Sequence, residues 1–80
     1  MIRVCYLDYN DVETEVGKAK DIQEMRKIMS DYLSNKNFKS YYTRTMGRTD
    51  DSIMIDFGSH SEFFVCYRKG LTAEVFKGVD

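Results

Sequence analysis

Two cysteines and one histidine are the side chains of this sequence best suited to bind a metal or to act in catalysis. Cys5, His60 and Cys66 are widely separated, and neither a C-x-x-C pair nor an H-x3-H spacing accompanies them. A closed zinc site has four ligands, so several carboxylates would have to come from elsewhere in the chain. We therefore expect no metal site and no cofactor.

A thiol nucleophile would need a base beside the sulfur, because the thiolate is the reactive form. Cys66 has His60 and Asp56 nearby in sequence, but an apolar-flanked cysteine more often packs than reacts. His60 and Glu62 form an H-x-E without the P-C-x-x-C of zinc deaminases. No glycine-rich phosphate loop occurs either. The expectation is a protein that is not an enzyme, with no catalytic residues.

A basic and aromatic segment, NKNFKSYYTRTMGR at residues 35–48, is the best candidate for nucleic-acid binding. Bases stack on aromatic rings while cations follow the phosphate backbone. The later stretch HSEFFVCY, at 60–67, matches only the end of the RNA-recognition signature and lacks its glycine and first aromatic. A basic edge strand that resists aggregation is the favoured explanation of the segment. The residues of this alternative site are Lys36, Lys39, Tyr41, Tyr42, Arg44 and Arg48.

The elements that would position these side chains follow from the spacing of apolar residues. Residues 2–9 are rich in strand formers, and the Asn10-Asp11 turn precedes a short alternating piece, 12–16, that Gly17 would end. Apolar residues at helical spacing then predict a helix over 19–35, with a capping-box-like start at Asp21 and Glu24. A stop is expected at 35–37.

After the helix the apolar period changes to two, and three glycines recur at intervals typical of antiparallel strands joined by tight turns. The predicted strands cover 39–46, 52–57, 62–68 and 71–77. The fold class is therefore α+β: a two-layer sandwich of one amphipathic helix on a mainly antiparallel sheet of four to six strands, in the order β(β)αββββ. No linker composition divides the chain, so residues 1–80 form one domain.

One face of this sheet would lie under the helix and the other would remain open. Alternation assigns Phe63, Val65 and Tyr67 to the helix side and Phe64 and Cys66 to the open side. Apolar neighbours on an open face often mark an interface, although loops or the N-terminal hairpin could equally cover them. The residues expected to bind a partner are Tyr41, Met54, Phe64 and Phe76.

The totals restrict the function further. A net charge of −1 gives no general attraction to nucleic acid or to an anionic membrane. The chain has no apolar run of membrane-spanning length and no export signal, so we expect a cytoplasmic protein with free thiols. The leading interpretation is a small interaction module, such as an inhibitor or accessory protein of a larger enzyme, whose partner is another protein or a second copy of itself. A weak single-stranded nucleic-acid binder is the alternative.

Overall fold

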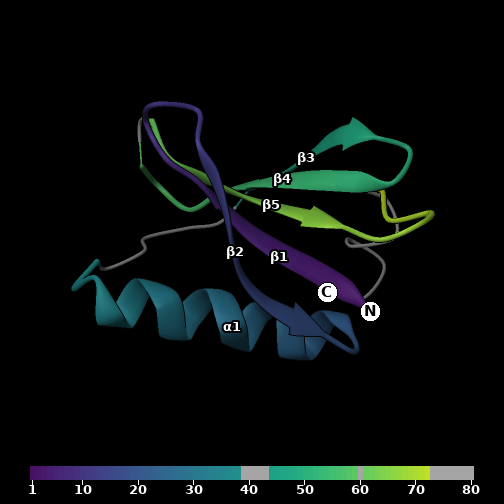
Figure 1. Cartoon of the computed structure of the whole chain (residues 1–80), viewed down its shortest axis with the longest axis horizontal. Helices are drawn as coiled ribbons and strands as arrows, with labels where there is room; N and C mark the ends of the chain where they lie inside the picture. Colours follow the sequence, from purple (N-terminus) through teal and green to yellow (C-terminus); the bar gives the residue numbers. More distant parts are fainter. Residues whose placement is uncertain (39–43, 60, 73–80) are drawn as a thin grey trace.

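The protein folds as one α-helix packed on an antiparallel sheet of five strands, which confirms the predicted α+β two-layer sandwich (Figure 1). This computed structural model describes residues 1–38, 44–59 and 61–72, and the architecture refers to them. No helix in these ranges is long and apolar enough to cross a membrane. The elements are β1 (Ile2–Leu7), β2 (Glu13–Ala19), α1 (Ile22–Asn35), β3 (Arg44–Thr49), β4 (Ser52–Asp56) and β5 (Phe63–Tyr67).

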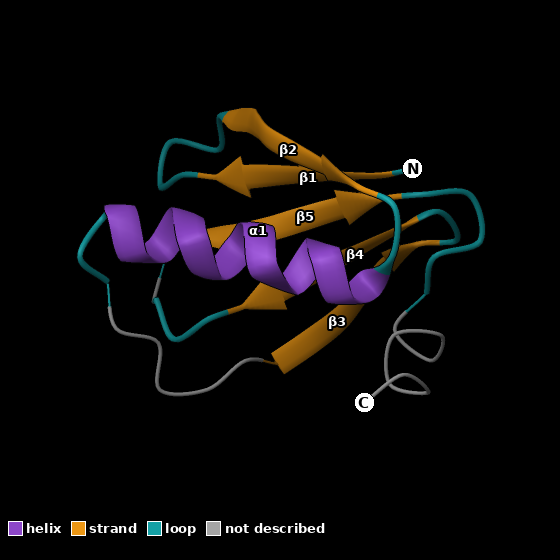
Figure 2. Ribbon diagram, turned by 90° about the horizontal axis from the view of Figure 1, so that it is seen from below, coloured by secondary structure: helices purple, strands orange, loops and turns teal. Residues whose placement is uncertain are grey.

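The strands are ordered β2-β1-β5-β4-β3, and every neighbouring pair is antiparallel. β5 therefore lies at the centre of the sheet, between the first strand and β4. Figure 2 shows α1 running across one face of the sheet. Because β5 joins the N-terminal hairpin to the β3–β4 hairpin, the sheet is complete only when distant parts of the chain have come together.

Both ends of α1 are closed by local hydrogen bonds. The Asp21 carboxylate accepts the Glu24 backbone N–H at 2.8 Å, as the spacing of these two residues predicts. At the other end Asn37 adopts a left-handed conformation, with φ of 57°. The Phe38 N–H then donates to the Leu33 carbonyl at 3.0 Å, a Schellman-type ending. These caps explain why the helix spans 22–35, inside the predicted 19–35.

The hydrophobic core lies between α1 and the sheet. In the sheet, Val4 pairs with Cys66 and Ile55 pairs with Phe64, so these four side chains share the helix-facing side. The helix contributes one row of buried apolar side chains, as its spacing predicts. The core residues are Ile2, Val4, Tyr6, Ala19, Ile22, Met25, Met29, Leu33, Ile53, Ile55, Phe57, Phe64, Cys66 and Leu71.

The predicted faces of β5 are wrong. Phe64 and Cys66 belong to the helix-facing core, with 1% and 0% exposure. Alternation then places Phe63, Val65 and Tyr67 on the opposite face. The sequence FFVCY is apolar at both parities, so alternation alone could not choose between the faces. The pairing register with β1 and β4 decides the choice.

Two glycines lie inside strands rather than at their ends. β2 continues through Gly17, where an added Cβ would lie 3.0 Å from the Ile28 Cγ2 of α1. Gly17 therefore permits a close approach of helix and sheet. Gly47 lies within β3, and the turn to β4 falls at Asp50-Asp51.

The last predicted strand covers 71–77. Its first two residues, 71 and 72, do not form a strand, and residues 73–77 lie outside the described residues. The predicted strand 39–46 is described only from Arg44, where β3 begins. Residues 39–43 likewise fall outside the described ranges.

Candidate functional site

The face of the sheet opposite α1, called the open face below, carries a continuous group of apolar side chains. Cys5 and Val65 are buried at its centre, with exposures of 4% and 0%. Half-buried apolar residues surround them. These residues, named the apolar stripe, are Leu7, Met46, Met54 and Phe63.

The register of the strands makes the apolar stripe continuous. Leu7 on β1 pairs with Phe63 on β5. Met54 on β4 pairs with Val65 on one side and with Met46 on the other. Directly opposed residues in an antiparallel pair lie within contact range on the same face. The stripe thus crosses four neighbouring strands from β1 to β3.

Polar side chains meet above the same face and connect its two outer strands. The Tyr67 hydroxyl donates to Glu13 Oε1 at 2.5 Å, and Arg48 Nη1 donates to the Tyr67 hydroxyl at 2.5 Å. Arg48 Nη1 also lies 3.4 Å from Glu13 Oε1. Burial, together with the Glu13 hydrogen bond, raises the pKa of Tyr67. This group of three residues is called the cross-sheet bridge.

The twist of the sheet accounts for the cross-sheet bridge. Glu13 begins β2 and Arg48 lies near the end of β3, so they occupy diagonally opposite corners of the sheet. In a flat sheet, edges four strand spacings apart would be separated by roughly 19 Å. The normal twist of a sheet raises two diagonally opposite corners toward the same face, here the corners of Glu13 and Arg48 toward the open face. The open face is therefore hollowed along that diagonal, and long side chains from its corners can meet over Tyr67.

Further ion pairs flank the apolar stripe. Arg3 Nε lies 3.6 Å from Glu15 Oε1 beside β1, and Arg44 Nη2 lies 3.9 Å from Asp56 Oδ2 beside β4. The Arg3 guanidinium also stacks over the Tyr67 ring, 4.7 Å from its centroid. The Arg3–Glu15 pair is exposed, and exposed pairs contribute little to stability, whereas Asp56 is buried. Their arrangement gives the open face an apolar centre with a polar border.

The residues predicted to bind a partner are only partly brought together. Met54 lies half-buried on the open face, where alternation places it. Phe64 was expected beside it and is instead buried under α1. Tyr41 and Phe76 lie outside the described residues. The sequence interpretation missed the other members of the apolar stripe, because only the strand register brings Leu7, Phe63 and Met46 next to Met54.

Of the cations proposed for nucleic-acid binding, the three that the structure describes each contact a carboxylate. Arg44 pairs with Asp56, and Arg48 pairs with Glu13. Lys36 Nζ lies 3.7 Å from Glu62 Oε1. Lys39, Tyr41 and Tyr42 lie outside the described residues. Among the described cations of this segment, part of the charge that would attract a phosphate backbone is therefore offset within the protein.

Lys36 also belongs to a cluster at the end of α1. Its ammonium lies 4.4 Å from the Tyr6 ring centroid and 5.6 Å from that of Tyr32. The Tyr6 hydroxyl donates to Glu62 Oε1. Burial, followed by this hydrogen bond, raises the pKa of Tyr6 well above its ordinary value. The cluster links the end of the helix to β1 and to the segment preceding β5, which is a structural role.

The side chains with catalytic potential are placed unfavourably for thiol chemistry. Burial raises the pKa of Cys66 to about 12, so its thiol keeps its proton near neutral pH. Cys5 is also buried, and its pKa is raised for the same reason. His60 lies outside the described residues. Within the part of the chain that is described, no group of three or more potential ligands is gathered for a metal ion.

Comparison of the chain with protein-family models, with curated proteins and with solved structures gave no significant match.

Proposed function

We propose that this protein is a small non-enzymatic module that binds another protein through the open face of its sheet. The observation that supports the proposal is the apolar stripe, in which Leu7, Phe63 and Met54 lie on adjacent strands with Met46 beside them. Contiguous apolar side chains on one face of a soluble protein commonly mark an interaction surface. The surface is therefore a better candidate for function than any internal site.

The border of the stripe suits a protein partner. Protein interfaces combine an apolar centre with a polar, solvent-accessible rim. Here the ion pairs Arg3–Glu15 and Arg44–Asp56 lie on two sides of the stripe. Methionine adapts its shape to a partner more readily than branched residues do. Met46 and Met54 would thus allow the face to fit a partner without a large change in the backbone.

A module of this size fits the role of an inhibitor or accessory protein that covers part of a larger enzyme. In a second version of this proposal, the partner that binds the open face is another copy of the same chain. We place the protein in the cytoplasm, because Cys5 and Cys66 are both free thiols. A reducing compartment keeps thiols in this state.

Replacing two residues of the apolar stripe tests the proposal. The double variant Met54→Lys with Phe63→Lys puts two charges at its centre while leaving the helix-facing core intact. We expect at least a tenfold loss of partner affinity, since charges are disfavoured at the centre of an interface. Partners captured from the native host would be identified by mass spectrometry, and self-association would be followed by sedimentation over a dilution series.

Tyr9 offers a matched control. It is apolar in its ring and 70% exposed, but it lies in the turn between β1 and β2 and outside the stripe. Tyr9→Ser should capture the same partner as the original chain. A folded double variant that retains full partner affinity and self-association would refute the proposal.

The alternative proposal is a weak single-stranded nucleic-acid binder that uses Lys36, Lys39, Arg44 and Arg48 with Tyr41 and Tyr42. It is the weaker proposal because the described cations of this set already contact carboxylates. If it holds, affinity for a fluorescent oligonucleotide must fall steeply with added salt. Anisotropy titrations at low and physiological ionic strength measure this. Binding that is absent at low salt, or indifferent to salt, excludes the alternative.

A further inference from the structure

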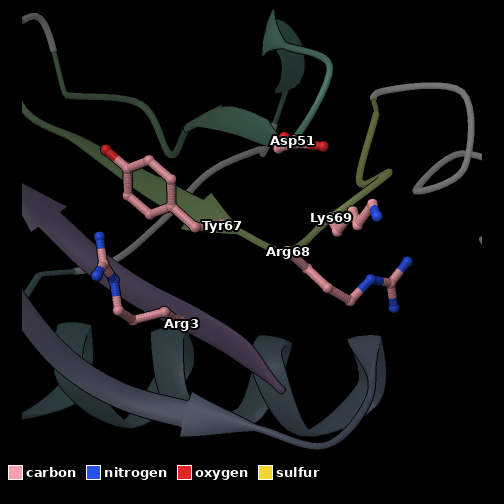
Figure 3. Close-up of a pocket in the computed structure, with 5 residues that line it drawn as sticks. All are labelled: Arg3, Asp51, Tyr67, Arg68 and Lys69. Atoms are coloured by element: carbon pink, nitrogen blue, oxygen red, sulfur yellow. The ribbon is translucent and has the colours of Figure 1, made fainter.

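A shallow depression lies at one end of the open face, beyond the apolar stripe. It has a volume of about 390 Å³ and is open to solvent on one side. Figure 3 shows Arg3 beside the Tyr67 ring, with Arg68 and Lys69 extending from the end of β5. Its lining residues are Arg3, Asp51, Tyr67, Arg68 and Lys69. Three of these five side chains are cations.

The cations of the depression are only partly neutralised. Arg3 shares its charge with Glu15, at 3.6 Å, and about half of each side chain remains exposed. Among the described residues, neither Arg68 nor Lys69 forms an ion pair. Of the lining residues that the structure describes, Asp51 is the only acid, and its Oδ1 accepts the Gly70 N–H at 2.9 Å. The described lining therefore has a net positive charge.

The backbone that carries Arg68 and Lys69 is held in place. The Arg68 N–H donates to the Asp51 carbonyl at 2.9 Å, and the Leu71 N–H donates to the Arg68 carbonyl at 2.9 Å. This turn requires a positive φ at its third residue, which Gly70 supplies at 76°. Only the long side chains are free to move toward a ligand, so little backbone order has to be created on binding.

The opposite wall is also fixed, because Tyr67 is held by the cross-sheet bridge. Its ring already has the Arg3 guanidinium at 4.7 Å and the Arg48 guanidinium at 5.7 Å. A nucleobase would have to displace them in order to stack on this ring. The depression is thus suited to recognise charge rather than an aromatic ring.

We infer that this depression binds a multiply charged oxyanion near Arg3, and that Arg68 and Lys69 contact this anion by turning from the orientation of Figure 3 toward Arg3. Guanidinium groups match the geometry of phosphate and carboxylate oxygens, and the lysine adds a mobile point charge. Asp51 positions the turn through its backbone and carboxylate contacts and does not contact the ligand. The ligand class is a phosphate-bearing or polycarboxylate small molecule, independent of the protein partner proposed for the apolar stripe.

Titrations with sodium pyrophosphate and with citrate, followed by amide NMR at constant ionic strength, test the inference. We expect saturable shifts centred on residues 67–70 for at least one of the two anions. Tighter binding of pyrophosphate identifies a phosphate group as the ligand chemistry, and tighter binding of citrate identifies carboxylates. The double variant Arg68→Gln with Lys69→Gln should weaken the binding at least tenfold.

Lys27 provides the matched control, because it is exposed on α1 and away from the depression. Lys27→Gln and the stripe variant Met54→Lys with Phe63→Lys should both retain anion binding. The NMR spectrum of each variant reports directly whether it is folded. Shifts that never saturate, that spread evenly over all cationic residues, or that persist in the Arg68 and Lys69 double variant would overturn the inference.

Discussion

Among single residues, Cys66 shows how burial at the centre of the sheet controls chemistry. Its side chain is fully buried between α1 and the sheet. It pairs with Val4 on β1 and with Ile53 on β4. Burial raises the pKa of this thiol from an ordinary 9.0 to about 12. In this environment the residue acts as a small apolar side chain, and because the folded thiol must keep its proton, folding becomes less favourable at alkaline pH.

The free energy of unfolding should therefore fall as pH rises from about 9 to about 12. In this window the unfolded thiol loses its proton while the folded thiol keeps it. The slope from one such proton is about 1.4 kcal/mol per pH unit. Urea denaturation at several pH values measures it, and Cys66→Ala should have the shallower slope. Equal slopes for the two proteins would show that the pKa of Cys66 is the same in the folded and the unfolded state.

β5, the strand that contains Cys66, also shows when the sequence alone cannot predict which face of the sheet a side chain occupies. Alternation correctly placed Met54 on the open face, because its neighbours Ile53 and Ile55 are unmistakably core residues. It misplaced Phe64, because Phe63 and Val65 are equally apolar. The pairing of Phe64 with Tyr6 and Ile55 decides the face, and pairing between distant strands cannot be derived from local pattern.

At the scale of elements, the packing of α1 on β2 depends on the missing side chain of Gly17. A Cβ at this position would lie 3.0 Å from Ile28 Cγ2 and 3.1 Å from Ile28 Cδ1. In the part of the chain that the structure describes, a Cβ at Gly47 would have no neighbour within 4 Å. The two strand glycines therefore differ in what they do for the fold, and they form a matched pair.

We predict that Gly17→Ala lowers the free energy of unfolding by about 1 kcal/mol through overpacking. Gly47→Ala should leave it unchanged or raise it by about 0.5 kcal/mol, since it restricts the unfolded chain. In an Ile28→Ala background the cost of Gly17→Ala should disappear, because the contacting side chain is gone. Denaturant titrations provide the values. Equal stability of the two single variants would contradict the close approach.

Elements with strong local signals were predictable. The helix, its capping residue Asp21 and its end at 35–37 followed from spacing and capping chemistry. The ends of the strands near Gly17 and Gly47 were not, because a glycine in the sequence indicates the end of a strand or a turn, whereas both glycines lie inside strands. In β2 the glycine serves the contact with α1, which is tertiary and has no local signature.

For the whole molecule, small size favours a functional site on the surface over an internal one. A chain of 80 residues buries only about 60% of its unfolded surface, which leaves little room for an internal site. The twist of the sheet hollows the open face and brings Glu13 and Arg48 together above it. The two-layer architecture was predictable from periodicity, whereas the strand order and this diagonal contact depend on long-range pairing.

Binding of a protein to the open face through the apolar stripe, as proposed above, is tested by the dissociation constant of the captured complex. It should be compared for the original chain, for Met54→Lys with Phe63→Lys, and for Tyr9→Ser. We predict at least a tenfold weaker complex for the double variant, about 1.4 kcal/mol, and no change for the control. A double variant that is folded and binds as tightly as the original chain would contradict the claim.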